Sequence, residues 1–254
     1  MAGLFRADGI VLSSRDFGEA DKLIRILTPR RGKIEAIAKG ARKANSSLRG
    51  GTQLLAYSSF LLYDGRELAT VTQCELRRSF IPLCGELGTL AHAYYLAEIA
   101  DAVVMPGEPN PGMFYLLLAS LSLLTRTDPE IVARAYEART LKLMGLQPRF
   151  KKCALCGRDL KQQNKVPFAI KAGGALCPKC CRGQDKVIFM NADALAAWKR
   201  LNFFPWEKLK CLHLGPGLLR ELAVVMPGYL EYQLERKLKS REFIGAIRGE
   251  SCGY

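Results

Sequence analysis

Apolar and polar residues alternate in short stretches through residues 1–80, which is the pattern of half-buried strands. We expect five strands: Gly9–Ser13, Lys22–Thr28, Lys33–Lys39, Leu54–Tyr63 and Glu67–Leu76. Pro29–Gly32 and the dipeptide Asp64-Gly65 carry turn signals between neighbouring strands. No stretch between the strands is long enough for a helical crossover, so the pattern predicts a small antiparallel barrel. We interpret it as an OB-type barrel, although an SH3-like barrel would have a similar pattern.

From about residue 86 the spacing of apolar residues becomes helical. The expected helices are Leu87–Val104, Gly112–Arg126, Pro129–Met144, Asn191–Leu201, Gly217–Val225 and Tyr229–Lys239. Asp128 before Pro129 and Glu130 is a strong helix start. Pro227 separates the last two helices, and the chain from Phe243 onward is expected to be weakly structured.

These patterns predict an α+β protein with two domains. We expect the barrel to be a domain of residues 1–80 and the helices to form a second domain of residues 81–254. A cysteine-rich segment, residues 150–183, lies between helices in sequence and is expected to be an insertion in the helical domain.

The insertion contains two Cys-x-x-Cys pairs, Cys153/Cys156 and Cys177/Cys180, about 20 residues apart. Two such pairs can supply the four thiolates that a tetrahedral zinc ion prefers, so the spacing predicts a zinc ribbon with one closed, structural ion. Lys165–Ile170 between the pairs has room for only a short strand. Thiol redox chemistry at one pair is an alternative, and Cys181 could replace Cys180 as a ligand, although the two-residue gap would then change.

The chain carries a formal net charge of +14, and its distribution is uneven. Residues 1–80 hold 14 basic and 8 acidic side chains, residues 81–150 hold 5 and 7, and residues 151–254 hold 19 and 9. Two basic ends around a nearly neutral middle favour two surfaces that bind one polyanion, most simply a nucleic acid. A basic surface without a ligand, or one that meets an anionic membrane, would have the same charges.

The barrel segment carries most of the candidate phosphate contacts. The loop Gly40–Thr52 is polar, rich in glycine and serine, and expected to be flexible. The cations that we expect to bind phosphates are Arg30, Arg31, Lys33, Lys39, Arg42, Lys43 and Arg49. Tyr57, Phe60 and Tyr63 could stack on bases, but aromatic residues on a strand are more often barrel core.

Motifs for catalysis are absent from the sequence. There is no phosphate-binding glycine loop of the P-loop or dinucleotide type, and His92 and His213 lack the neighbours of a zinc hydrolase or deaminase. We therefore expect no enzyme activity. The longest apolar run, Met113–Leu124, is too short to cross a bilayer, and Met1–Arg15 does not resemble a signal peptide, so we expect a cytoplasmic protein.

Two segments resemble the RecO family of bacterial recombination mediators. GEADKLIRILTPRRGKIEAIAKGARK, Gly18–Lys43, is similar to the family's N-terminal signature, and MGLQPRFKKCALCG, Met144–Gly157, is similar to its entry into the cysteine cluster. The resemblance implies an OB domain that binds single- and double-stranded DNA and anneals complementary strands. It also implies partnership with RecR and single-strand-binding protein, help in loading RecA, association with the nucleoid, and no catalytic residues. Zinc is carried over because all four cysteines are present.

Two further classes of protein remain open on the residues alone. A zinc-ribbon RNA-binding protein or transcription factor would use the same charges and the same cysteines. A thiol-redox enzyme would use Cys153 and Cys156 as its reactive pair.

Overall fold

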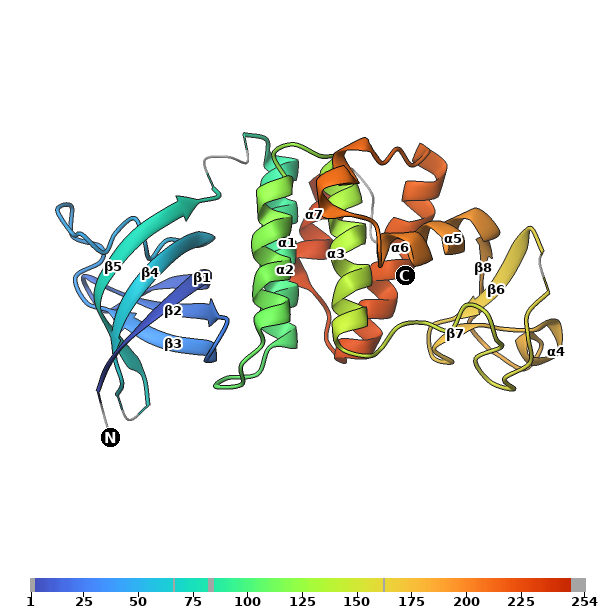
Figure 1. Ribbon diagram of the computed structural model, residues 1–254, viewed down its shortest axis with the longest axis horizontal. Coiled ribbons are helices and arrows are strands. Elements are labelled where there is room, and N and C mark those ends of the chain that lie inside the picture. Colours follow the sequence, from blue (N-terminus) through green and yellow to red (C-terminus); the bar gives the residue numbers. More distant parts are fainter. Residues whose placement is uncertain (1–2, 66, 82–84, 162, 248–254) are drawn as a thin grey trace. The chain divides into compact units, whose positions relative to one another are not determined.

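The computed structural model describes residues 3–65, 67–81, 85–161 and 163–247 (Figure 1). The chain forms two compact units. Met1–Arg126 together with Leu238–Tyr254 make up the first, which we call the barrel unit, and Thr127–Lys237 make up the second, the cysteine unit. This division does not follow the expected domain boundary at residue 80, which stays a prediction about which segments fold independently.

The barrel unit begins with five strands that form a closed barrel in the order β1-β2-β3-β5-β4. The strands are β1 (Leu4–Phe17), β2 (Asp21–Thr28), β3 (Gly32–Ala38), β4 (Ala56–Tyr63) and β5 (Ala69–Ser79). All neighbours are antiparallel except β3 and β5, which pair in parallel. The expected five-stranded OB-type barrel is thereby confirmed, and the parallel pair corrects the expectation of a wholly antiparallel sheet.

One long strand closes the barrel. The first half of β1 pairs with β4 and the second half with β2, and Ile10 belongs to both ladders. A bulge between Val11 and Ser13 lies where the strand passes from one partner to the other. A bulge increases local bending and twist, so β1 can turn from one side of the barrel to the other.

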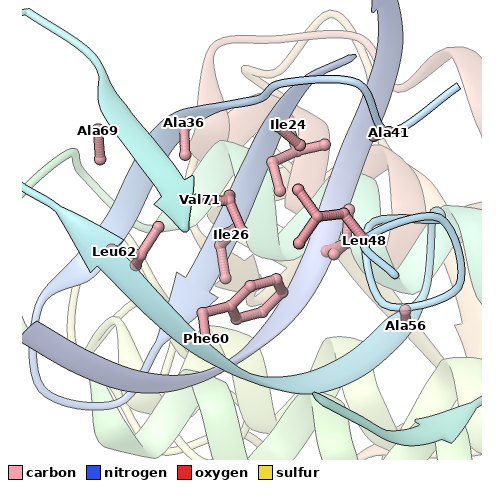
Figure 2. Packing of buried hydrophobic residues seen from close by; sticks show 12 residues of the cluster. Ile24, Ile26, Ala36, Ala41, Leu48, Ala56, Phe60, Leu62, Ala69 and Val71 are labelled. Atoms are coloured by element: carbon pink, nitrogen blue, oxygen red, sulfur yellow. The ribbon is translucent and has the colours of Figure 1, made fainter. Parts of the chain in front are cut away.

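The interior of the barrel is filled by the alternate residues that the sequence pattern marks as apolar (Figure 2). On β2, Ile24 and Ile26 point into this core and are almost fully buried. Phe60, on β4, is 1% exposed and lies across from them, so it belongs to the core and does not form part of a base-stacking surface. Leu27, on the opposite face of β2, is also fully buried.

The loop between β3 and β4 is tightly wound, in contrast to its expected flexibility. Successive backbone hydrogen bonds run through it, among them Lys43 N–H to the Gly40 carbonyl and Arg49 N–H to the Ser46 carbonyl. Leu48 and Ala41 are buried in the barrel core. Polar composition alone could not indicate these two anchors, because they are isolated apolar residues among serines, glycines and cations.

Three helices complete the barrel unit: α1 (Leu87–Val103), α2 (Pro111–Leu123) and α7 (Lys239–Ile247). Helices α1 and α2 lie side by side, α1 contacts β1, and α2 contacts β2 (Figure 1). The first two agree with the expected helices. Helix α7 begins at Lys239, where the last expected helix was to end, and continues past Phe243 into the segment that was expected to be weakly structured. It packs against α1 although well over 100 residues separate them in sequence.

The body of the cysteine unit is formed by the helices α3 (Pro129–Leu143), α5 (Ala192–Leu201) and α6 (Pro216–Leu234), together with the 3₁₀ helix η1 (Trp206–Cys211). Between α3 and α5 lie β6 (Lys165–Ala169), β7 (Gly174–Ala175), the single turn α4 (Pro178–Cys181) and β8 (Ile188–Asn191). The three strands form a sheet in the order β7-β6-β8.

The expected break at Pro227 is wrong, because α6 continues through it. Proline inside a helix removes one backbone hydrogen bond and costs roughly 3 kcal/mol. Pro227 is buried together with Met226 and Tyr229, so the packing of this face of α6 offsets the loss. The sequence shows the proline, and hence the cost of placing it in a helix. It does not show the tertiary contacts that offset this cost.

Candidate metal centre and nucleic-acid interface

The four cysteines of the two Cys-x-x-Cys pairs converge on one point. Their sulfur atoms all lie within 4.8 Å of one another, and the Sγ atoms of Cys156 and Cys177 are 3.8 Å apart. A tetrahedral ion with Zn–S bonds of about 2.3 Å would hold its sulfurs about 3.8 Å apart. The four thiols therefore have the spacing and the chemistry of a site for a soft metal ion.

Each pair sits on a tight backbone turn. Gly157 N–H donates to the Cys153 carbonyl at 2.9 Å, and Gly157 adopts a φ of +72°, a conformation that favours glycine. In the second pair, Cys181 N–H donates to the Cys177 carbonyl at 2.9 Å. These turns place the first and fourth residues of each motif so that both thiols face inward.

Backbone hydrogen bonds favour the ionised form of two of the thiols, Cys153 and Cys177. Burial raises the pKa of Cys153, but hydrogen bonds from the N–H groups of Cys156, Cys177 and Leu155 outweigh it and lower the pKa to about 6. The N–H of Cys180 lowers the pKa of Cys177 in the same way. The Cys180 thiol donates to Cys177 and Cys156, and its pKa rises to about 12. Four neighbouring sulfurs cannot all carry negative charge without a cation among them.

Cys181 lies outside this cluster. It packs against the small hydrophobic group that includes Ala169 and Leu176, whereas Cys180 supplies the fourth sulfur. Cys180 is thus the candidate ligand that keeps the two-residue gap, and Cys181 contributes to packing.

The cysteine module is attached to the helices by aromatic rings. Trp198 of α5 contacts Phe150 and Phe168, with ring centroids 5.4 Å and 5.7 Å away. Tyr229 of α6 contacts both Trp198 and Phe168, and its hydroxyl donates to the Leu146 carbonyl. Such contacts each contribute about 0.5–1.5 kcal/mol beyond burial, so the module and the helical body form one packed structure.

The loop from Lys39 to Arg49 carries most of the free positive charge among the candidate phosphate contacts. Lys39, Lys43 and Arg49 have exposed side chains that form no ion pair with any described residue. Because Leu48 and Ala41 anchor the loop in the core, these three cations project from a fixed backbone.

Arg42 has a different environment. Its guanidinium donates to the carbonyls of Gly18 and Glu19 and lies 3.3 Å from a carboxylate oxygen of Asp16. It therefore holds the β1–β2 turn against the loop, and only part of its side chain faces solvent.

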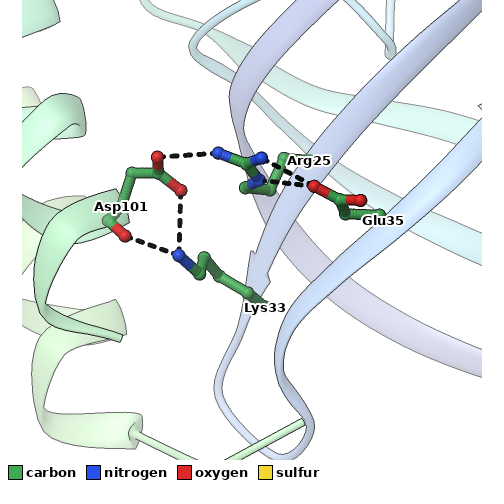
Figure 3. A network of polar contacts seen from close by, with 4 residues as sticks. All are labelled: Arg25, Lys33, Glu35 and Asp101. Carbon is green, nitrogen blue, oxygen red and sulfur yellow. Dashed lines mark hydrogen bonds and ion pairs between the residues drawn. The ribbon is translucent and has the colours of Figure 1, made fainter. Parts of the chain in front are cut away.

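Lys33 does not point freely into solvent (Figure 3). Its ammonium group lies 3.2 Å from a carboxylate oxygen of Asp101 on α1 and donates to the Asp101 backbone carbonyl at 2.5 Å. The second oxygen of Asp101 binds Arg25 at 2.7 Å, and Arg25 also binds Glu35. Burial opposes the charge on Arg25, but its two acidic partners outweigh burial and raise its pKa.

Arg30 and Arg31 lie at the opposite end of β2 from the loop. Lys22 pairs with Ala38 at the loop end and Thr28 pairs with Gly32 at the other, so about 20 Å of strand separates the two turns. Both are exposed, but only Arg31 has partners among the described residues: its guanidinium lies 3.8 Å from the Phe5 ring centroid and 3.8 Å from a carboxylate oxygen of Asp64. The seven predicted cations therefore do not form one patch.

The strand register adds a residue that the sequence reasoning missed. Lys22 lies opposite Ala38, directly beside Lys39, and bonds to the Ser14 hydroxyl. The sequence pattern marked Lys22 only as a strand residue. The register between β2 and β3 was needed to place it near the loop. Of the remaining aromatic candidates, Tyr57 packs against Phe114, while Tyr63 is 45% exposed.

Throughout the part of the chain that the structure describes, no helix has both the length and the apolar character needed to cross a membrane.

Comparison with known families accounts for nearly the whole chain. The family described as recombination protein O, N terminal, matches residues 1–80, and recombination protein O, C terminal, matches residues 84–242. A protein of Moorella thermoacetica named DNA repair protein RecO is 53% identical over 99% of this chain and 94% of its own length. Proteins of the same name from Desulforamulus reducens and Symbiobacterium thermophilum are 36% and 35% identical, each over at least 96% of both chains. With its barrel, its helices and its four clustered cysteines, the chain belongs to the RecO family.

Proposed function

We propose that this protein is a non-enzymatic DNA-binding mediator of recombinational DNA repair. The observation that carries the proposal is the anchored basic loop at one end of an OB-type barrel, where Lys39, Lys43 and Arg49 are exposed and unpaired among the described residues. OB folds bind nucleic acids through a basic groove and the loops beside it. The name DNA repair protein RecO, given to the relatives, supports the same role.

The proposed activity is to hold single- and double-stranded DNA and to anneal complementary strands. Two phosphate chains repel each other, and a surface with a net charge of +14 offsets that repulsion by displacing counterions. Annealing needs no covalent step, so the proposal requires no catalytic residue. Membership of the family further supports RecR and single-strand-binding protein as partners, help in loading RecA, and a cytoplasmic location at the nucleoid.

For the metal centre we infer a single structural zinc ion, held by Cys153, Cys156, Cys177 and Cys180. The all-sulfur set leaves no position for water or substrate, which is typical of ions that stabilise a fold. Bound zinc would neutralise the thiolates that the backbone hydrogen bonds favour. A reactive thiol pair would instead need an open, attackable sulfur.

Charge reversal in the loop tests the DNA proposal. The double variant Lys39→Glu, Lys43→Glu should weaken binding of oligonucleotides at least tenfold and reduce the salt slope by roughly 0.7 for each lost contact with a single strand. Annealing of complementary oligonucleotides should slow in parallel. Arg42 and Lys33 are left unchanged because their side chains hold the fold.

A matched control reverses two exposed cations elsewhere in the barrel unit, Arg6→Glu and Arg126→Glu. The control changes the net charge by the same amount as the loop variant. If both variants lost the same DNA affinity, the loss would come from the overall charge of the protein, and the assignment of the loop would be wrong. If the wild-type chain bound RNA but not DNA at low salt, the proposed function itself would be wrong. Arg30→Glu, at the far turn, measures whether that end of the barrel also contacts DNA.

A further inference from the structure

A groove in the cysteine unit runs between one face of α5 and the segment that leads into the first cysteine pair. Its main hollow has a volume of about 840 Å³. One wall is the exposed stripe of α5, where Ala196, Lys199 and Arg200 are followed at helical spacing by Phe203. The other wall is formed by residues 149–152, of sequence Arg-Phe-Lys-Lys, and by Gly157.

The groove is strongly basic. Five cations line the main hollow and no acidic residue does: Arg149, Lys151, Lys152, Lys199 and Arg200. Within the described residues none of the five forms an ion pair, although Arg149 donates to the Ala154 carbonyl. Burial, together with the charge of Lys151, lowers the pKa of Lys199. Like charges are thus held close together without a counter-charge, which an anionic ligand would relieve.

Two aromatic rings lie among these cations. Phe203 is 71% exposed, and the Lys142 ammonium lies 3.7 Å from its ring centroid. Phe150 is only partly exposed: Trp198 contacts it edge-on, with ring centroids 5.4 Å apart, and the Lys199 ammonium lies 5.4 Å from its centroid. Phe203 is therefore the ring with more surface available for a flat ligand.

The groove is also longer than one hollow. A second hollow of about 380 Å³ shares Phe150, Lys151, Ala196 and Lys199 with the first. It adds Lys161 and one acid, Asp159. A small anion would occupy only part of this path, whereas a linear ligand with repeated negative charges would follow it.

We propose that this groove is a subsite for single-stranded DNA, in which phosphates lie against Lys151, Lys152 and Lys199 while a base stacks on Phe203. The inference rests on the proposed DNA-binding function and adds a site within the cysteine unit. The positive charge of the groove favours a polyanion, and the exposed Phe203 ring favours a polyanion that carries flat apolar groups. In duplex DNA the faces of the bases are covered by neighbouring bases, so duplex DNA would gain only the phosphate contacts.

Equilibrium binding of fluorescent oligothymidylate to the full-length, metal-loaded protein tests this site. Phe203→Ala should weaken binding about tenfold, in the range of one lost base stack. Lys151→Glu with Lys152→Glu should reduce the salt slope by roughly 1.4, for two lost contacts. Neither substitution alters a buried side chain, so circular dichroism and metal content should match those of the wild type.

Controls of the same kind lie elsewhere in the same unit. Phe189→Ala removes a ring that is 59% exposed on β8, and Lys208→Glu with Lys210→Glu reverses two exposed cations of η1. Both should leave the affinity for oligothymidylate within about twofold of the wild type. Binding of duplex DNA should separate the contribution of the Phe203 ring from that of the lysines, because Phe203→Ala should change the affinity for duplex DNA little.

Ultraviolet cross-linking to oligothymidylate with peptide mapping gives an independent readout. Adducts at residues 149–152 or 196–203 are expected; adducts confined to the barrel unit would overturn the groove. Wild-type affinity in both groove variants, with loss in the barrel-loop variant, would remove this inference and leave the proposed function intact. Absence of DNA binding by the wild-type chain would remove both. Phe203-dependent binding of an acidic peptide without any effect on DNA would reassign the groove to a protein partner.

Discussion

At the scale of single residues, the cations of the barrel fall into two groups: those bound to other groups of the protein and those without such partners among the described residues. Lys33 and Arg25 are bound to carboxylates, and Arg42 is bound to carbonyls, so these three hold secondary structure elements together. Lys39 and Lys43 have no such partners among the described residues. The same chemical group stabilises the fold in one place and remains available for a ligand in another.

Removing the charge of Asp101 should destabilise the barrel unit. Asp101→Asn leaves Lys33, whose side chain is 12% exposed, without its ionic partner, and we expect a loss of about 2 kcal/mol in the free energy of unfolding. Urea denaturation measures it. Glu35→Gln is the control, because Glu35 is 43% exposed and its pair with Arg25 should contribute less than about 1 kcal/mol. Equal effects of the two substitutions would contradict the role given to Asp101.

Removing one thiol should lower metal content and stability together. Cys153→Ser replaces a fully buried sulfur of the cluster, so on the proposal of one zinc ion per chain we expect the bound zinc to fall toward none, with a lower Tm. Cys211→Ser, at an exposed cysteine outside the cluster, should change neither. A Cys153→Ser protein that kept both its zinc and its Tm would show that the metal is not bound at this cluster.

The sequence could indicate that the four cysteines come together but not how the cations are paired, and distance along the chain explains the difference. Each Cys-x-x-Cys turn is local, and two such turns at short separation already imply one site. Lys33 and its partner Asp101 are 68 residues apart. No pattern within the barrel segment could show that a helix would supply a carboxylate to Lys33.

At the scale of elements, the start of α7 is capped by a carboxylate of α1, the helix against which it packs. Glu98 of α1 accepts hydrogen bonds from the backbone N–H groups of Lys239 and Ser240 at 3.0 Å and 2.9 Å, and from the Ser240 hydroxyl. The first N–H groups of a helix have no partner within it, and the helix dipole favours negative charge there. Glu98 therefore acts as a cap supplied by another helix.

Glu98→Ala should release the first turn of α7. We expect a loss of about 2 kcal/mol in the stability of this helix, because the cap bonds and the charge interaction are lost together. Hydrogen exchange of the α7 amides should accelerate while that of β2 and β3 stays unchanged. Glu242→Gln, an exposed acid on α7 itself, is the control. Unchanged α7 exchange in Glu98→Ala would disprove the capping role.

Alternation and helix period predicted strands β2 to β5 and the helices α1, α2 and α3 closely, because their signals are strong and local. For β1 the pattern marked only Gly9–Ser13, whereas the strand runs from Leu4 to Phe17, because pairing with β4 and then β2 extends it at both ends. Three elements departed from the pattern: α6 continues through Pro227, the loop at residues 40–52 is wound and anchored, and α7 forms from a weak signal. In each case a tertiary contact decides the local structure. Leu48 of the loop packs into the barrel core, and Glu98 of α1 accepts a hydrogen bond from the first turn of α7.

At the scale of the whole molecule, the four-cysteine cluster proposed to hold a metal ion belongs to only one of the two compact units. All four clustered cysteines lie in the cysteine unit, and the aromatic contacts around Trp198 join their module to α5 and α6. The barrel core is built from other residues, in the other unit. Loss of metal should therefore affect the two units unequally.

Treatment with a strong chelator should loosen the cysteine unit and leave the barrel folded. Limited proteolysis and hydrogen exchange should show new cleavage and lost protection within residues 150–183, with strands β1 to β5 still protected. Readdition of zinc should restore the original pattern. Simultaneous loss of protection in both units would mean that they unfold as one, contrary to this expectation.

The path of the chain through the two units has a consequence for its synthesis. The barrel unit takes its last helix, α7, from beyond residue 238, after the whole cysteine unit has been made. Domains generally fold as they leave the ribosome, but here the surface of α1 that receives α7 must wait, uncovered, for more than half of the polypeptide to emerge. A nascent chain stalled before that point would leave this surface of α1 open to its surroundings, so slower translation through the cysteine unit should lengthen the time in which the incomplete barrel unit can misassemble.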